Sequence, residues 1–190
     1  MYVLNRIAVL PWILLLAVSM GCSGKDRSAV PVSIMAATPF TYEGHIGRIW
    51  GGDNFEVSEN GRIHYVLIRG IDTPEPGQKF HDESKAMILY LATRNKMTMN
   101  VLERDDWKRE VCDLRLTDPK TGEVFDPSLE LLKKGMAWFD QSDGPYAEAY
   151  REAEALAREK KIGLWSQPNP VPPWEFWERQ VEQIQGGSED

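Results

Sequence analysis

The chain has 190 residues, of which 42% are hydrophobic and 27% are charged, and its formal net charge is −7. This length and balance fit one globular domain with short appendages. The acidic excess argues against a protein that coats nucleic acid non-specifically, because such proteins attract phosphates through a surplus of Lys and Arg.

Residues 1–22 are predicted to be a lipoprotein-type signal peptide. Arg6 supplies a short positive region, and residues 7–20 form an almost unbroken apolar run of 14 residues. Such a run is too short for a typical membrane span, which needs about 20 residues. Residues 19–22 (Ser-Met-Gly-Cys) loosely resemble a lipobox, so we expect lipidation of Cys22 and a membrane-anchored envelope protein that faces the periplasm or the outer surface. An ordinary signal peptide, which would give a secreted protein, and an uncleaved anchor are the alternatives.

Three further segments follow in chain order. Residues 23–41 contain prolines and small residues without a clear period, which predicts a tether. Residues 42–179 are the expected folded domain, and residues 180–190 are expected to form a flexible tail that ends in small and acidic residues.

The folded domain begins with strands and ends with helices. Gly51-Gly52 and Asn60-Gly61 are turn signals between short apolar-alternating runs. The five predicted strands are residues 44–50, 54–58, 62–71, 96–103 and 110–117. The three predicted helices are residues 82–95, a helix that begins at Asp126-Pro127 and ends at Gly135, and residues 146–157. This order predicts an α+β, mainly β fold: a five-stranded OB-fold Greek-key barrel with about three packed helices.

Two carboxylates leave the third predicted strand together in the segment Asp72-Thr73-Pro74-Glu75. On one flat strand they would point to opposite faces, but the Thr-Pro bend can bring both to one point. Asp53, which follows the Gly51-Gly52 turn, is expected near the same end of the barrel. Carboxylate and carbonyl oxygens are the ligands of hard cations such as Ca²⁺. The residues therefore predict a cation site at Asp53 and Asp72, with Glu75 beside a metal-side water.

Two arginines are candidates for binding phosphate, because the planar guanidinium fork can hold two phosphate oxygens at once. Arg109 opens the fifth predicted strand, and Arg69 lies at the end of the third. Arg109 could instead pair on the surface with a neighbouring acid (Asp105, Asp106 or Glu110). For Arg69, a catalytic role and an outward structural role are equally compatible with the sequence.

Five motifs in this order resemble the staphylococcal nuclease (thermonuclease) family over about residues 44–179. They are Asp72-Thr73-Pro74-Glu75 after an apolar strand, an aspartate-aromatic-basic-Arg segment that ends at Arg109, Gly135-Met136-Ala137-Trp138, Gly163-Leu164-Trp165 and Pro172-Pro173-Trp174-Glu175. One motif alone would be weak, whereas five in the family's order make coincidence improbable.

The resemblance implies a Ca²⁺-dependent endonuclease that hydrolyses DNA, with RNA as a further substrate, and produces 3′-phosphate ends. It is expected to act as a monomer. The implied roles are Ca²⁺ ligation by Asp53, Asp72 and the Thr73 carbonyl, handling of the attacking water by Glu75, phosphate binding by Arg109, and packing on the nucleotide by Trp107. Other conspicuous residues are expected to be structural: Cys112 as a half-buried strand residue, and Trp165 and Trp174 as packing residues for the C-terminal segment.

Two departures from the family pattern bear on activity. Leu67, eight residues before Glu75, stands where the family has an arginine, and Arg69 lies two residues later as a possible migrated replacement. Gly51 stands where the family has an outer-shell acid, which predicts weaker metal binding. These departures motivate the alternative of a catalytically impaired nuclease-like module that binds nucleic acid or acts as a scaffold. A generic OB-fold binder of oligosaccharide or peptide would leave the Asp72–Glu75 segment unexplained.

Overall fold

The structure is a computed structural model that describes residues 39–140 and 144–186. The chain divides into two units, residues 1–34 and 35–190, and every described residue belongs to the second. The predicted signal peptide, Cys22 and nearly all of the predicted tether lie outside the described residues. Within the described part, no helix is both long and apolar enough to cross a membrane.

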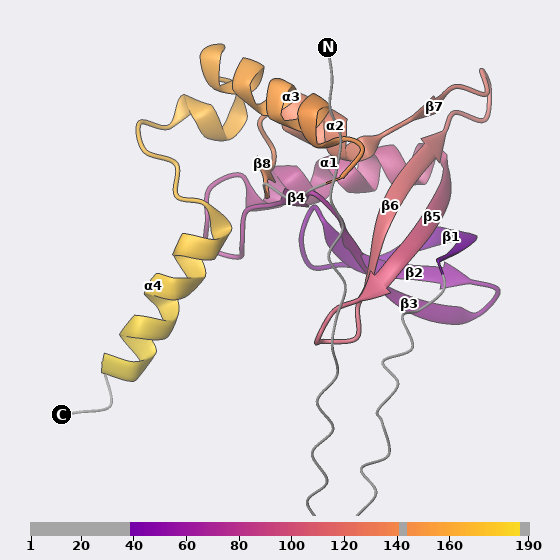
Figure 1. The fold of residues 1–190 in the computed structure, drawn as a ribbon, viewed down its shortest axis with the longest axis horizontal. Helices are drawn as coiled ribbons and strands as arrows, with labels where there is room; N and C mark the ends of the chain where they lie inside the picture. Colours follow the sequence, from indigo (N-terminus) through magenta and orange to yellow (C-terminus); the bar gives the residue numbers. More distant parts are fainter. Residues whose placement is uncertain (1–38, 141–143, 187–190) are drawn as a thin grey trace, which may run out of the picture. The chain divides into compact units, whose positions relative to one another are not determined.

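Five strands form the predicted barrel, and all five were expected from the sequence (Figure 1). They are β1 (Phe40–Ile49), β2 (Asn54–Glu59), β3 (Arg62–Ile68), β5 (Lys96–Arg104) and β6 (Glu110–Thr117). The sheet order is β3-β2-β1-β5-β6, followed by the short β7 (Val124–Phe125). A parallel pairing between β3 and β6 closes the barrel and aligns Val66 with Glu110. The start of β6 therefore lies beside the end of β3, although the two are far apart in the sequence.

The barrel core follows the alternation of the strands, because successive side chains of a strand point to opposite faces. In β6 every second residue is buried, from Glu110 through Cys112 and Leu114 to Leu116. Cys112 is fully buried rather than half-buried as expected. The buried side chains of the neighbouring strands complete the core, for example Phe55 and Met99.

The three predicted helices are confirmed with ends that differ by one or two residues. They are α1 (His81–Arg94), α2 (Pro127–Lys133) and α3 (Ala147–Glu159), and they pack at one end of the barrel (Figure 1). The predicted cap of α2 is present, since the Asp126 side chain accepts a hydrogen bond from Ser128 N at 2.9 Å. Gly135 adopts a φ of +61°, and a Cβ there would lie 2.3 Å from the Ile162 carbonyl oxygen. The close approach of these two backbone segments therefore requires glycine at position 135. It positions the short 3₁₀ helix η1 (Gly163–Ser166).

Two features differ from the sequence prediction. The single strand expected over residues 62–71 is split: β3 ends at Ile68, Gly70 turns the chain with a φ of +84°, and β4 (Ile71–Asp72) pairs with β8 (Trp138–Phe139) instead. The second difference is the helix α4 (Pro173–Gly186), which occupies residues 180–186 of the expected flexible tail. Residues 187–190 lie outside the described residues.

Candidate active site

One cleft of about 1140 Å³ brings most of the predicted site residues together. The acids Asp53, Asp72 and Glu75 line it together with Arg109 and Trp107. These residues come from the β1–β2 loop, from β4 and the loop after it, and from the turn before β6. The parallel closure of the barrel explains the meeting, because it places the start of β6 beside β3 and the acids that follow it.

The two acid-bearing loops are joined by Thr73. Its hydroxyl accepts a hydrogen bond from Gly52 N at 2.9 Å and donates one to Asp53 Oδ1 at 2.5 Å. Thr73 and Asp53 are only 2% and 4% exposed, so this contact is shielded from water. The loop is tightly packed: a Cβ at Gly52 would lie 2.1 Å from Ser84 Oγ, and one at Gly51 would lie 2.9 Å from Asp53 Oδ1. An acid at position 51 would therefore require the Asp53 and Asn54 side chains to shift.

Burial and mutual repulsion raise the pKa values of the two predicted metal ligands. Burial raises the pKa of Asp53 to about 6, although the hydrogen bond from Thr73 opposes the rise. Burial also raises the pKa of Asp72 to about 8, with further contributions from the negative charges of Asp53, Glu75 and Asp140. Carboxylates crowded in this way repel one another when ionised, and a bound cation would relieve that repulsion.

The loop that carries Glu75 is held by its own residues. Glu75 N donates a hydrogen bond to Gln78 Oε1 at 2.8 Å, and Gln78 N donates one to the Glu75 carbonyl at 2.9 Å. His81 Nδ1 lies 2.6 Å from the Pro74 carbonyl oxygen, which ties the loop to the first residue of α1. Gln78 also reaches toward the C-terminus, since its Nε2 donates to the Val171 carbonyl at 2.8 Å.

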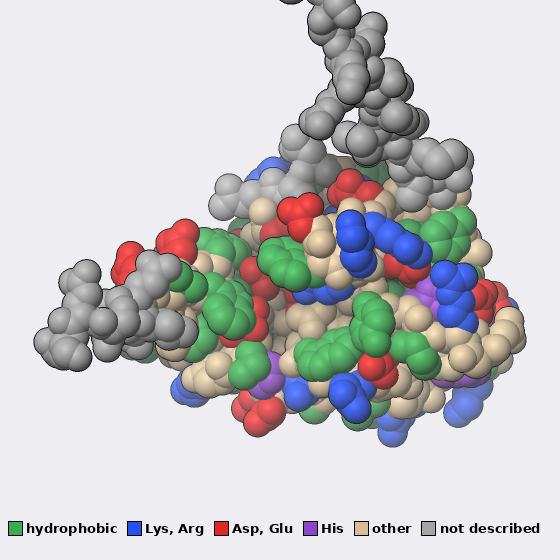
Figure 2. Space-filling view, turned by 90° about the horizontal axis from the view of Figure 1, so that it is seen from below, with side chains coloured by type: hydrophobic (Ala, Val, Ile, Leu, Met, Phe, Trp, Pro, Cys, Tyr) green, Lys and Arg blue, Asp and Glu red, His purple; other side chains and the backbone are tan. Residues whose placement is uncertain are grey.

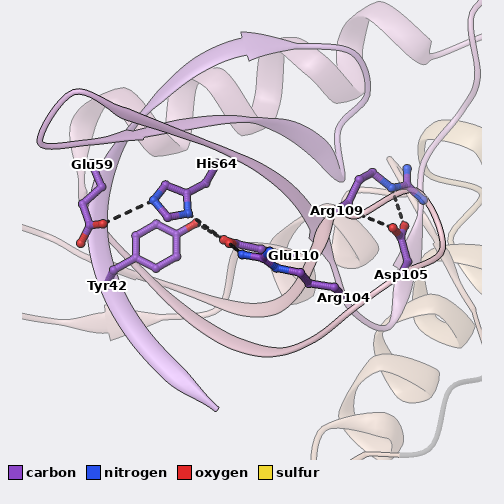
Figure 3. Close-up of polar contacts among 7 residues, drawn as sticks. All are labelled: Tyr42, Glu59, His64, Arg104, Asp105, Arg109 and Glu110. Atoms are coloured by element: carbon purple, nitrogen blue, oxygen red, sulfur yellow. Dashed lines mark hydrogen bonds and ion pairs between the residues drawn. The ribbon is translucent and has the colours of Figure 1, made fainter. Parts of the chain in front are cut away.

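Arg109 is held in the cleft by Asp105, as Figure 3 shows. The Asp105 carboxylate accepts hydrogen bonds from Arg109 N at 2.9 Å and from Arg109 Nε at 2.6 Å. The guanidinium carbon lies 5.3 Å from the centre of the Trp107 ring, which is 78% exposed. The surface pairing considered as an alternative role is thus present, but it orients an arginine that lines the cleft.

A buried polar network holds Glu110, the residue directly after Arg109 (Figure 3). Its carboxylate accepts a hydrogen bond from Tyr42 Oη at 2.9 Å and one from Arg104 Nη2 at 2.7 Å, and it lies 2.9 Å from His64 Nδ1. His64 Nε2 lies 3.3 Å from Glu59 Oε2 on its other side. Burial opposes ionisation of Glu110, but the bonds from His64, Tyr42 and Arg104 outweigh it and hold its pKa below the ordinary value.

The structure does not bring Arg69 to the acids. Arg69 forms a bidentate ion pair with Asp113, with Nε to Oδ1 and Nη2 to Oδ2 both 3.0 Å, and it lines a separate small cavity beside Phe139 and Tyr146. Because β3 ends at Ile68, the alternation that would have aligned Arg69 with Leu67 does not continue to residue 69. Leu67 itself lines the acidic cleft.

Several cleft residues were not predicted as site residues. Asp140 lines the cleft and follows β8, which pairs with the strand of Asp72. The Gly-Met-Ala-Trp motif just before Asp140 was the only sequence feature that could have indicated this position. The expectation that Trp174 is a packing residue is wrong, because this side chain is 40% exposed and lines the cleft, whereas Trp165 is buried as expected. The other unpredicted aromatic residues of the lining are Trp50, Tyr65 and Trp177.

Comparison with known proteins gives a consistent result. The family described as "Staphylococcal nuclease homologue" matches residues 65–167, more than half of the chain. The micrococcal nuclease of Shigella flexneri is 29% identical over 143 residues, which are 73% of this chain and 81% of that protein. An uncharacterized endonuclease of Escherichia coli O157:H7 is 28% identical over 69% of this chain and 82% of its own length.

A plant relative shares the domain within a much longer protein. The probable staphylococcal-like nuclease of Oryza sativa subsp. japonica is 32% identical over 60% of this chain but only 22% of its own length. The matched segment contains Asp72, Thr73, Glu75 and Arg109, the residues that meet at the cleft or brace it. The chain therefore belongs to the staphylococcal nuclease homologue family of nucleic-acid-hydrolysing enzymes.

Proposed function

We propose that the chain is a Ca²⁺-dependent endonuclease that hydrolyses phosphodiester bonds of DNA, with RNA as a further substrate, outside the cytoplasm. The observation that carries this proposal is the convergence of Asp53, Asp72, Glu75 and Arg109 on one cleft. That set combines hard oxygen ligands, a carboxylate that can take a proton, and a phosphate-binding cation.

The residues present fit a Ca²⁺ ion held by Asp53, Asp72 and the Thr73 carbonyl. Both carboxylates are costly to ionise where they lie, which favours a cation beside them. Within the described part of the chain, no group of three or more His, Cys, Asp and Glu side chains is arranged to hold a metal. The proposed site therefore relies on two carboxylates, a carbonyl and water, a mixture that Ca²⁺ accepts. When bound, the ion supplies positive charge to the phosphate oxygens and orders the nearby water.

Two side chains of the cleft carry the other catalytic roles. Glu75 orients the attacking water and accepts its proton. Its side chain lines the cleft, and Gln78 fixes the loop that carries it. Arg109 binds the phosphate and stabilises the charge that develops on its oxygens, with Asp105 holding the guanidinium through Nε. Among the described residues that line the cleft, Arg109 is the only one with a positively charged side chain. Leu67 contributes no charge, so we expect slower turnover than in a site with two arginines.

The cleavage test uses the full-length protein with plasmid DNA, single-stranded DNA and RNA, in Ca²⁺ or in chelator. We expect cleavage only with Ca²⁺. Glu75→Gln should reduce turnover by about 10²- to 10⁴-fold, the usual contribution of general-base assistance, and Arg109→Ala by at least as much. Lys120→Ala, in the turn between β6 and β7, is the control for an unrelated loss of charge. Binding of oligonucleotide without any Ca²⁺-dependent cleavage would instead support the nuclease-like binding or scaffolding module.

The location outside the cytoplasm rests on residues 1–22 and on Cys22. We propose an envelope lipoprotein that acts as a monomer, with secretion as the outcome if Cys22 is not lipidated. Metabolic labelling with a palmitate analogue should mark the full-length protein, and Cys22→Ser should abolish the label. Recovery of unlabelled protein from the medium would contradict the lipid anchor and leave the nuclease proposal intact.

A further inference from the structure

We infer that helix α4 carries a base-binding surface of the cleft, formed by Trp174 and Trp177, which stacks on bases of an unpaired strand next to the phosphate bound by Arg109. This inference rests on the proposed function, since it assigns the substrate contacts of the same cleft. Every base presents a flat π face, so a stacking surface accepts any sequence, but it needs bases that are not already stacked within a duplex.

The lining of the cleft contains several exposed aromatic rings. Trp174 is 40% exposed and Trp177 is 53% exposed, and both line the cavity that contains Asp72 and Glu75. Figure 2 shows hydrophobic side chains on the lobe formed by α4 and on the barrel beside it. Exposed tryptophan is costly in water, and both tryptophans share a cleft with Arg109, the proposed phosphate-binding residue, which favours a ligand with both phosphate and aromatic groups.

The barrel supplies a second aromatic pair in the same lining. Trp50 and Tyr65 are 40% and 51% exposed, and their ring centres lie 5.9 Å apart. Trp107, a further aromatic residue of the lining, lies beside Arg109. Aromatic rings therefore flank the phosphate site from both the barrel and α4, which suits a strand that continues beyond the reacting phosphate.

The position of α4 relative to Glu75 is fixed by direct contacts. Gln78 accepts a hydrogen bond from Glu75 N and donates one to the Val171 carbonyl, two residues before α4 begins. Next to it, a Cβ built on Gly77 would lie 3.8 Å from Phe176 Cζ, so the first turns of α4 pack close to the loop of Glu75. The start of α4 is thus attached to the loop of Glu75, and Trp174 and Trp177 follow within the next turn and line the same cleft.

The family match of residues 65–167 ends before α4, which begins at Pro173. The resemblance noted at Pro172-Pro173-Trp174-Glu175 assigned Trp174 only a packing role and did not include Trp177. The charges of α4 also argue against a membrane-binding role for its exposed face. Glu175, Glu178 and Glu182 outnumber the basic residue Arg179 over the described side chains, whereas helices that bind anionic membranes carry Lys and Arg on their polar face. Since α4 offers few cations for phosphate, the inference assigns its tryptophans to the bases and leaves phosphate binding to Arg109.

The test measures equilibrium binding of a labelled single-stranded 12-nucleotide DNA and the matching duplex to the full-length protein in Ca²⁺. All proteins carry Glu75→Gln, so that cleavage is slow. The double variant Trp174→Ala/Trp177→Ala should raise the dissociation constant for the single strand by about 10- to 100-fold, the effect of losing one or two base stacks. The double variant with Phe at both positions should stay within a few-fold of the parent, because it keeps the rings. The control Val181→Ala, an exposed apolar residue of the same helix that does not line the cleft, should bind like the parent.

Affinity of the duplex should be the same in all of these proteins. The inference is overturned if the double alanine variant binds the single strand like the parent, if duplex binding weakens in parallel, or if the parent binds single strand no better than duplex. It is also overturned if the double alanine variant loses binding only to phosphatidylglycerol vesicles, which would assign α4 to the membrane. Failure of the proposed function appears separately, as absence of Ca²⁺-dependent plasmid cleavage by the protein with Glu75 intact.

Discussion

Competition between protons and Ca²⁺ at Asp53 and Asp72 provides the sharpest quantitative expectation. Both groups have raised pKa values, so lowering the pH protonates them and removes ligands from the ion. A ligand that must lose a proton reduces the apparent affinity by the factor 1 + 10^(pKa − pH). Between pH 8 and pH 6, the pKa of about 8 at Asp72 corresponds to a loss of about 50-fold, and the pKa of about 6 at Asp53 to about twofold. Because the negative charge of Asp53 contributes to the raised pKa of Asp72, the two factors are not independent, and we expect Ca²⁺ affinity to fall by up to about 100-fold over this interval.

Calorimetric titration with Ca²⁺ at pH 6, 7 and 8 measures this dependence directly. Asp72→Asn should bind Ca²⁺ weakly at all three values and should lose most of the pH dependence. Glu43→Gln, which alters an exposed surface ion pair with Lys96, is the matched control and should titrate like the wild type. Affinity that is independent of pH, or an Asp72→Asn variant that binds as tightly as the wild type, would refute the reasoning.

The same pKa shift makes a second, metal-free expectation for stability. The pKa of Asp72 in the folded protein lies above its value of about 3.9 in an unfolded chain. Its contribution to stability is therefore present at low pH and is lost as the pH rises from about 4 through about 8. In chelator, the wild type should lose stability relative to Asp72→Asn over that window, and saturating Ca²⁺ should reverse the difference at pH 8. Denaturant unfolding at a series of pH values tests this, and parallel curves for the two proteins would contradict it.

The remaining predictions concern the barrel. Arg69→Ala should leave turnover almost unchanged and reduce the free energy of unfolding by about 1–3 kcal/mol, because it removes both hydrogen bonds to Asp113; a loss of activity without a loss of stability would return Arg69 to the site. Leu67→Arg should raise turnover in steady-state cleavage assays, because Leu67 lines the cleft and Arg109 is the only basic residue among the described lining residues. An unchanged or lower rate would contradict this prediction. Glu110→Gln should reduce the free energy of unfolding by about 3 kcal/mol in urea titrations, because it removes the buried carboxylate that accepts hydrogen bonds from Tyr42 and Arg104. Glu130→Gln, at a surface ion pair with Lys133, should cost little.

The sequence predicted the parts of the site that depend on local pattern. Alternation of apolar residues located the five barrel strands, and the bend at Thr73-Pro74 indicated that Asp72 and Glu75 could converge. The position of Arg69 could not be predicted in this way. Its side-chain direction depends on where β3 ends, and the end is set by the turn at Gly70 and by the pairing of β4 with β8, which is a contact between distant segments.

The aromatic lining was missed for a related reason. Trp174 was predicted from the sequence to be a packing residue, and only the placement of α4 beside the Glu75 loop shows that its ring remains exposed. The buried network at Glu110 could not be predicted from the sequence pattern either. Tyr42 and His64 occupy inward positions of two different strands, and their contacts with Glu110 appear only once the barrel is closed.

The parallel pairing of β3 with β6 has a consequence for how the protein acquires activity during folding. It joins residues such as Leu67 and Val111 that are distant in the chain, and contacts of that kind form late because the intervening loop must close first. A chain with β1 to β5 formed would already hold Asp53 and Asp72, but Arg109 would not yet be beside them. Recovery of cleavage during refolding should thus follow closure of the barrel and not the earlier formation of its hairpins, so that catalysis serves as a time-resolved report on the last step of assembly.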